Sequence, residues 1–191
     1  MSELRQVADA VAVGTVGGKL KKFCEEAHAI LAASPGSEGA RRVKPLLEAL
    51  VAAPDFVAEH CGPDAKPGLH LLYEDPDLGF QVLAHVNDKG RVSPPHNHGA
   101  SWAIYAQAVG YTDMTEWACT PDPANPPRYE VKPATKYRVN PGEAGIYADG
   151  AVHSIDYQGG SRFVRVTGTN LDKIERTFFN PATGESRVVT P

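Results

Sequence analysis

Short extended segments separated by turn residues constrain the fold of this chain more than any other feature. Gly, Pro, Asn and Asp interrupt the apolar runs after Leu69, and these residues favour turns over continued strands. We predict strands over residues 69–73, 80–86, 111–119, 129–131, 136–139, 154–157, 162–167 and 176–179. Many short strands with such turns favour a mainly β barrel or sandwich over an α/β arrangement.

The first third of the chain has a helical pattern instead. Residues 19–33 carry apolar side chains at the spacing of one helix face, and Pro35 and Gly36 end this pattern. A second helix is predicted over residues 39–53, and Pro54 begins a short third one, because proline is favoured in the first turn. We expect one domain over residues 1–191, with a helical region at 1–64 and the β region at 69–180.

The composition excludes several classes of function. The net charge is −4 and no basic run occurs, so nucleic acid and anionic membrane surfaces are not expected partners. We find no apolar run long enough to cross a bilayer and no signal peptide. Cys24, Cys61 and Cys119 are odd in number and widely spaced, which indicates reduced thiols. We therefore expect a cytoplasmic protein, as a monomer or a homodimer.

A pair of histidines follows two prolines, in the segment Pro94-Pro95-His96-Asn97-His98-Gly99. The prolines favour an extended chain, on which alternate side chains point to the same side. His96 and His98 therefore present two imidazoles together, and neutral imidazole is a common ligand of divalent metals. The alternative is that both are polar residues of an exposed loop.

A second segment strengthens the metal interpretation. Residues 139–155 contain a Pro-Gly turn, a short strand, a Gly turn and then His153. Together with residues 90–110, this segment resembles the two sequence motifs of the cupin superfamily. The resemblance implies a double-stranded β-helix (jelly-roll) barrel with the helical region packed on its outside. It also implies that His96, His98 and His153 bind one metal ion inside the barrel.

The first motif departs from the common cupin pattern. Most cupins place a glutamate shortly after the second histidine, where this chain has Trp102 and Ala103, and no carboxylate occurs before Asp113. A site of three neutral histidines resembles cysteine dioxygenase, its 3-mercaptopropionate dioxygenase relatives and the related predicted metal-dependent double-stranded β-helix enzymes. The resemblance implies one divalent metal. Fe(II) suits such a site, while Zn, Ni, Mn and Cu remain open, because ligand type discriminates poorly among them.

The substrate-binding residues of cysteine dioxygenases are not retained. No arginine occurs near Leu69 and His70, where their carboxylate-binding arginine would fall, and Ala103 stands where some of them carry a cross-linked cysteine. Two positions of their Ser-His-Tyr relay hold Arg165 and Thr167. We therefore do not transfer cysteine as the substrate.

Four other residues are candidates for chemistry. Tyr105 alternates with Ala103, so it can face the metal, and we predict it to be catalytic. We predict substrate binding by Trp102, Gln107 and Arg165. The alternatives are core packing with satisfied polar ends for Tyr105 and Gln107, core packing for Trp102, and an outward-facing position for Arg165.

Two classes of function follow from this site. The first is a mononuclear metal-dependent oxygenase that binds a small organic substrate and dioxygen. The second is a non-oxygenase cupin, such as an isomerase, a lyase or a metal-dependent binding protein. Because no ligand carries charge, the metal is expected to favour an anionic substrate in either case.

Overall fold

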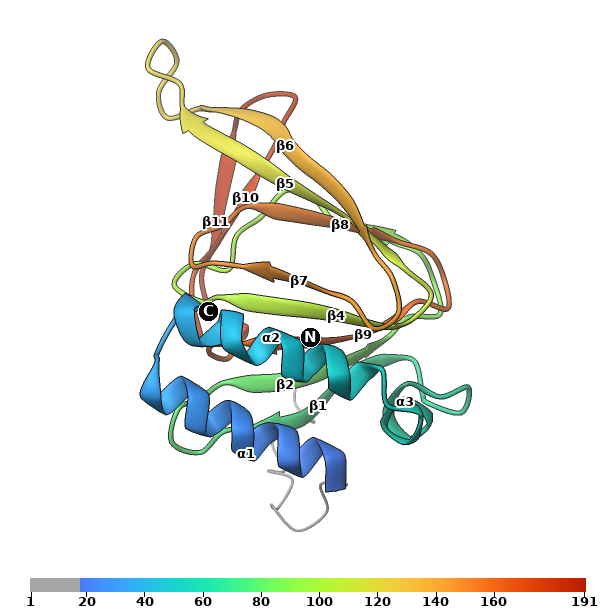
Figure 1. Cartoon of the computed structure of the whole chain (residues 1–191). Helices are drawn as coiled ribbons and strands as arrows, with labels where there is room; N and C mark the ends of the chain where they lie inside the picture. Colours follow the sequence, from blue (N-terminus) through green and yellow to red (C-terminus); the bar gives the residue numbers. More distant parts are fainter. Residues whose placement is uncertain (1–17) are drawn as a thin grey trace.

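The computed structural model describes residues 18–191, which form two facing antiparallel sheets with helices on one side (Figure 1). Residues 1–17 of the predicted helical region lie outside the described residues. The strands are β1 Gly68–Glu74, β2 Gln81–Val86, β3 Arg91–Val92, β4 Ala103–Val109, β5 Thr112–Pro121, β6 Tyr129–Val139, β7 Ala144–Tyr147, β8 His153–Tyr157, β9 Arg162–Thr167, β10 Arg176–Phe179 and β11 Ser186–Val189. One sheet has the order β1-β2-β9-β4-β7, and the facing sheet has the order β3-β8-β5-β6.

The path of the chain defines the fold. From β2 to β9 the chain crosses repeatedly between the two sheets, and the pairings within both sheets are antiparallel. Two facing sheets connected in this way form a jelly-roll, or double-stranded β-helix, barrel. The structure therefore confirms the predicted mainly β fold. A separate hairpin of β10 and β11 lies beside the barrel (Figure 1).

Three helices cover the outer face of the five-stranded sheet. They are α1 Gly18–Ala33, α2 Ser37–Val51 and α3 Pro54–Cys61. The apolar stripe of α1 is buried, and it shares one core with the outward-facing strand residues Val82, Ile104, Ala106, Val164 and Val166. On α2, the Glu48 carboxylate also accepts a 3.0 Å hydrogen bond from the Ala144 amide at the start of β7.

The inner faces of the sheets form a second core. Alternate residues of a strand point to opposite faces, so the neighbours of the outward-facing residues line the barrel interior. This interior cluster consists of Ala103, Tyr105, Met114, Val139, Tyr147, Tyr157 and Phe163. The two faces of β4 and β9 therefore have different roles.

Some strand predictions were incomplete. Residues 129–131 and 136–139 belong to one strand, β6, although Pro133 and a bulge opposite Glu116 and Trp117 interrupt its pattern. The short strands β3 and β11 were not predicted, because an exposed pair of residues and an exposed C-terminal segment show no apolar alternation.

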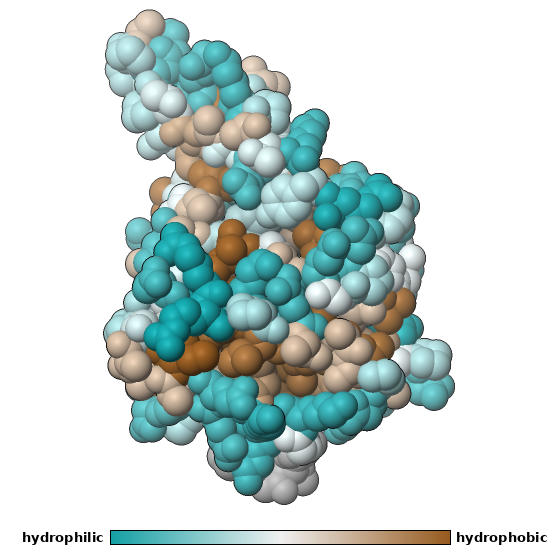
Figure 2. Space-filling view, in the orientation of Figure 1, coloured by the Kyte–Doolittle hydropathy of each residue, from teal (hydrophilic) through white to brown (hydrophobic). Residues whose placement is uncertain are grey.

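The molecular surface agrees with this layering. Figure 2 shows apolar side chains gathered in a band at the level of α1 and α2, bordered by hydrophilic residues. No helix within residues 18–191 is long and apolar enough to cross a membrane.

Candidate metal centre

The two histidine segments lie directly opposite each other. His96 and His153 form an antiparallel bridge, in which each backbone N–H donates to the carbonyl oxygen of the other residue at 2.9 Å. Segments far apart in the sequence are therefore held in register by the backbone itself. Residues directly opposite on paired strands carry neighbouring side chains, so this bridge brings the two imidazoles together.

A tight turn positions His98 beside them. Gly99 has a φ of 55°, which favours glycine, and a Cβ atom there would lie 2.2 Å from the carbonyl oxygen of Glu175. The Asn97 side-chain oxygen accepts hydrogen bonds from the Gly99 amide and from the Thr177 amide of β10. The β10–β11 hairpin thus fixes the loop that carries the histidine pair.

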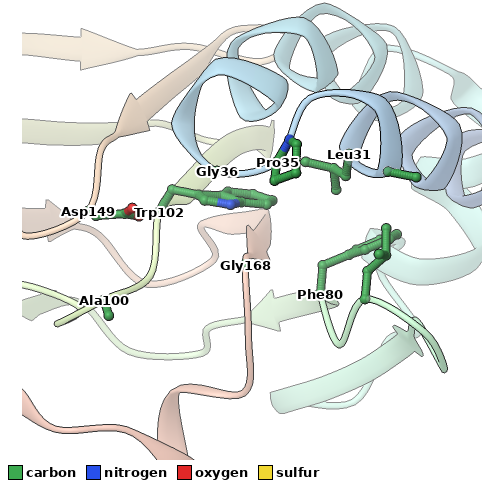
Figure 3. Close-up of a pocket in the computed structure, with 10 residues that line it drawn as sticks. Leu31, Pro35, Gly36, Phe80, Ala100, Trp102, Asp149 and Gly168 are labelled. Carbon is green, nitrogen blue, oxygen red and sulfur yellow. The ribbon is translucent and has the colours of Figure 1, made fainter.

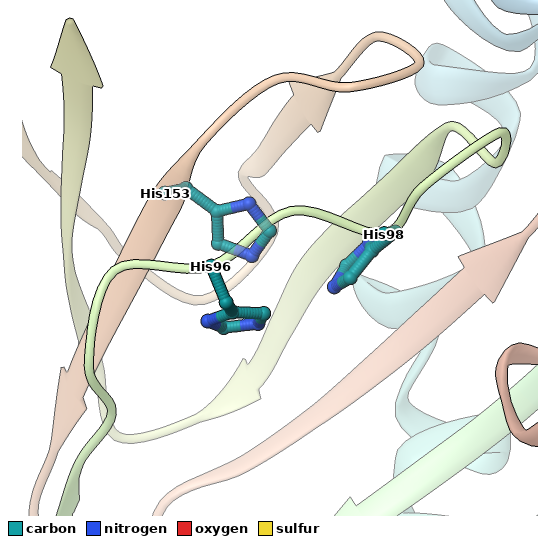
Figure 4. Close-up of side chains that lie close together, drawn as sticks. All are labelled: His96, His98 and His153. Atoms are coloured by element: carbon teal, nitrogen blue, oxygen red, sulfur yellow. The ribbon is translucent and has the colours of Figure 1, made fainter. Parts of the chain in front are cut away.

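The three histidines converge on one point, as Figure 4 shows. One ligand atom from each of His96, His98 and His153 lies within 4.8 Å of the others. The Nδ1 atom of His96 is 2.9 Å from the Pro94 carbonyl oxygen, which only accepts, so this nitrogen carries the proton and Nε2 is free to bind a metal. His153 is completely buried, and neither of its ring nitrogens has a hydrogen-bond partner among residues 18–191.

The environment keeps the imidazoles neutral. Burial lowers the pKa of His96, and it lowers the pKa values of His98 and His153 well below the ordinary value of an imidazole. Neutral imidazole is the form that binds metals. A buried nitrogen without a partner is also costly, and a metal ion would satisfy one of the two ring nitrogens of His153. The residues present therefore fit a metal ion held by three histidines.

Aromatic rings hold the imidazoles in place. Phe178 of the hairpin stacks on His96 with the ring centroids 5.3 Å apart, and Tyr147 of β7 stacks on His153 at 4.0 Å. The Tyr105 hydroxyl lies 3.3 Å from His98 Nε2. Tyr105 is buried, and burial raises the pKa of its phenol. The phenol therefore stays protonated beside the three histidines.

A pair of hydrogen-bonded tyrosines connects the site with a carboxylate. The hydroxyls of Tyr137 and Tyr147 are 2.8 Å apart, and a Cβ atom on Gly145 would come within 3.1 Å of both. Burial raises the pKa of both phenols, and the nearby Glu116 carboxylate adds to this effect. Glu116 lies opposite His153 on the neighbouring strand, β5. These residues show no signal in the sequence, since only strand pairing brings them to the site.

The structure places Arg165 inside the barrel rather than at its surface. On β9, Arg165 pairs with Tyr105 of β4, so both side chains are on the inner face. The positive charge of Arg165 opposes part of the rise in the pKa of Tyr105 and contributes to the lowered pKa values of the three site histidines. Arg165 and Tyr105 therefore belong to the same region as the histidines.

Trp102 and Gln107 are not brought to this region. Trp102 belongs to the core beneath the helices, and it lines a cleft of about 310 Å³ together with Leu31, Pro35 and Gly36 (Figure 3). Trp102 precedes Ala103 on the chain, so it points to the opposite face of the sheet. Gln107 is on the inner face, but its amide is bonded to Ser161, to the Val109 carbonyl and to Thr112. Satisfied hydrogen bonds of this kind are typical of a structural residue.

A second group of possible metal ligands lies outside the barrel. His28 of α1, Asp75 and Asp77 have ligand atoms within 4.8 Å of one another. Asp75 is buried and accepts hydrogen bonds from the Tyr73 hydroxyl and from the Asp77 and Leu78 amides, besides its 2.8 Å contact with His28. These bonds stabilise the β1–β2 turn and its contact with α1. They explain why the three residues cluster, so no metal ion is needed to explain it.

Comparison with known proteins gives similarity of fold alone. No family model matches the sequence, and no curated protein matches it. Among solved structures, KdgF from Halomonas sp. is 19% identical with a TM-score of 0.40, over 55% of this chain and 82% of that one. The Cnp3 cupin domain of Schizosaccharomyces pombe is 14% identical with a TM-score of 0.41, over 56% and 66% of the two chains. A cupin superfamily protein from Desulfitobacterium hafniense is 12% identical with a TM-score of 0.41, over 58% and 86%.

Proposed function

We propose that this protein is a mononuclear metal-dependent oxygenase of a small organic substrate. The observation that carries the proposal is the convergence of His96, His98 and His153 inside the barrel, with both ring nitrogens of His153 lacking partners among the described residues. Three neutral ligands leave further coordination positions open. Fe(II) is the proposed metal, with Zn, Ni and Mn as alternatives, and the substrate class differs from that of the cysteine dioxygenases.

The proposed roles follow from the geometry. When bound, Fe(II) would supply an electrophilic centre at which substrate and dioxygen meet. Tyr105 would hold a proton at its hydroxyl, 3.3 Å from His98 Nε2, and would donate it to a substrate oxygen or sulfur. Arg165 would orient an anionic group of the substrate. The buried side chains of Met114 and Phe163 would exclude water from the site.

A second candidate function is favoured by the tyrosines. The Tyr105 hydroxyl lies 3.3 Å from His98 Nε2, and the hydroxyls of Tyr137 and Tyr147 are 2.8 Å apart, so phenol O–H groups that could relay a proton in a metal-dependent isomerase or lyase lie around the site. Such an enzyme would use the metal to stabilise an enolate and would consume no dioxygen.

One experiment separates the two functions. The protein is purified without an affinity tag, its metal content is determined by elemental analysis, and the Fe(II) form is mixed anaerobically with a panel of small acids and thiols. Oxygen uptake after admission of air supports the oxygenase. Substrate conversion without oxygen uptake would replace it with the isomerase or lyase, and absence of bound metal would contradict both.

A further inference from the structure

We propose that the cleft between the helices and the barrel binds a small aromatic amine that also carries a hydrogen-bond acceptor. This site lies outside the barrel and shares no side chain with the histidine centre, so the inference goes beyond the proposed function. The cleft has a volume of about 310 Å³, at the lower end of the range for small-molecule sites. Its walls come from α1, the α1–α2 turn, the β1–β2 turn and the segments that precede β4 and β8 and follow β9 (Figure 3).

The indole of Trp102 is the first sign of a ligand in this cleft. The side chain is only 5% exposed, yet its N–H donates no hydrogen bond within residues 18–191. Trp117, in contrast, donates from its indole nitrogen to the Ser154 hydroxyl at 2.9 Å. Buried tryptophan N–H groups usually have an acceptor. Because Trp102 lines the cleft, a ligand there would supply the missing acceptor.

Gly168 holds the indole in this position. Its amide donates a 3.2 Å hydrogen bond to the Trp102 carbonyl oxygen, so the two backbones are joined. A Cβ atom at residue 168 would lie 2.7 Å from the indole nitrogen and 3.0 Å from the adjacent ring carbon Cε2. The ring therefore lies directly against a backbone that has no side chain to cover it. This arrangement leaves the N–H without a partner from the neighbouring segment.

The charge of the lining selects a cation. Among the residues that line the cleft, Asp149 is the only one with an ionisable side chain, and its exposed carboxylate has no ion-pair or hydrogen-bond partner within the described part of the chain. The end of α1 and the start of α2 also border the cleft, but their dipoles have opposite signs and offset each other. The carboxylate therefore favours an ammonium group, which also gains from the nearby indole ring.

The rest of the lining determines the body of the ligand. Leu31, Pro35 and Phe80 present hydrocarbon surface beside the Trp102 ring. A flat aromatic group buries such surface well, and it packs favourably on other aromatic rings. An aliphatic amine would leave part of these walls in water, and an organic acid would meet the Asp149 carboxylate. An aromatic ring with an ammonium group at one end and an acceptor at the other fits all three features.

The test uses tyramine and two probes that each lack one of its features. Tyrosol replaces the ammonium group with a neutral hydroxyl, and phenethylamine lacks the phenol oxygen. Their affinities for the protein as purified are measured by calorimetry. We expect a Kd of about 0.1–1 mM for tyramine and about fivefold weaker binding of each other probe. In the Trp117→Phe variant, Trp102 is the single tryptophan, so its fluorescence, excited at wavelengths that phenols do not absorb, should change on binding.

Variants assign each preference to one residue. Asp149→Asn should reduce the affinity for tyramine to that for tyrosol. Trp102→Phe keeps a ring and should remove the preference for tyramine over phenethylamine. Asp64→Asn removes an exposed carboxylate outside the cleft and should leave all three affinities unchanged. Ala100→Phe fills the cleft from an exposed position and should abolish tyramine binding, so it tests the site even if Trp102→Phe does not fold.

Four outcomes would overturn the site. They are no binding of tyramine, equal binding of tyramine and tyrosol, tyramine binding that survives in Ala100→Phe, and binding that leaves the Trp102 fluorescence unchanged. Equal binding of tyramine and phenethylamine would overturn the role of the Trp102 N–H. The proposed function fails on a different result, the absence of bound metal, because no residue that lines the cleft is one of the three histidines.

Discussion

The two faces of the five-stranded sheet contrast sharply, although the same strands build both. The outer face of β4 and β9 carries Ile104, Ala106, Val164 and Val166, which pack beneath the helices. The inner face carries Tyr105 and Arg165 beside the three histidines. Strand alternation thus assigns neighbouring residues either to stability or to chemistry. Variants at adjacent positions should separate the two properties.

The largest effect, a loss of metal binding, is expected at the three histidines that lie beside the inner face. His153→Ala should weaken metal binding more than about 100-fold, because it removes one of three ligands, whereas loss of an outer-shell partner costs 10- to 100-fold. Metal content after dialysis, measured by elemental analysis, checks this expectation. His70→Ala on the edge strand β1 is the matched control and should retain the metal. Unchanged metal content in His96→Ala, His98→Ala and His153→Ala would rule out this centre.

The neighbours Ile104 and Tyr105 provide the sharpest test of the two faces. Ile104 is completely buried under the helices, so Ile104→Ala should lower the free energy of unfolding by about 2–5 kcal/mol and leave metal content unchanged. Tyr105→Phe removes only a hydroxyl beside His98, so it should lower the free energy of unfolding by about 1 kcal/mol or less. The same variant should turn over the substrate more slowly. Urea unfolding and elemental analysis of both variants test this. If both variants lost the same free energy of unfolding, the outer face would not serve stability more than the inner face does.

A smaller effect is expected from a new ligand charge on the inner face. Ala103 is buried and faces the interior, at the region where many cupins carry a glutamate. Ala103→Glu should tighten metal retention and weaken binding of small thiolates or enolates by about tenfold, because a carboxylate compensates part of the metal charge. Calorimetric titration of the wild type and the variant measures both. If the glutamate binds the metal and anion affinity stays the same, ligand charge does not control the site.

The smallest effect concerns pH on the helix side. The Asp75 carboxylate accepts a hydrogen bond from the His28 imidazole, and this bond raises the pKa of His28. Because the folded-state pKa lies above the unfolded value of about 6.5, this contact stabilises the fold fully below that pH, and the contribution disappears as pH rises through the folded pKa. Urea unfolding of wild type and His28→Gln should therefore differ more at about pH 5.5 than at about pH 8.5. A difference that grows with pH would contradict this sign.

The sequence by itself determined the class of fold and the central histidines. Gly and Pro turns between short alternating runs predicted a mainly β barrel, and the apolar stripe of residues 19–33 predicted the first helix. The spacing of His96 and His98 placed two imidazoles on one side, and the resemblance of the second segment to a cupin motif added His153. The strands, the helix and the histidine pair depend on local periodicity, which is visible in a single sequence, whereas His153 rested on the resemblance alone.

Only the tertiary structure decided which other residues surround the histidines. Trp102, next to Ala103 in sequence, faces the helices, and Gln107 is fully bonded within the core. Glu116 and Tyr137 showed no signal in the sequence, because strand register across β5, β6 and β8 brings them to the site. Pairing between distant strands is a property of the whole fold, since each strand's pattern fixes its faces but not its partner.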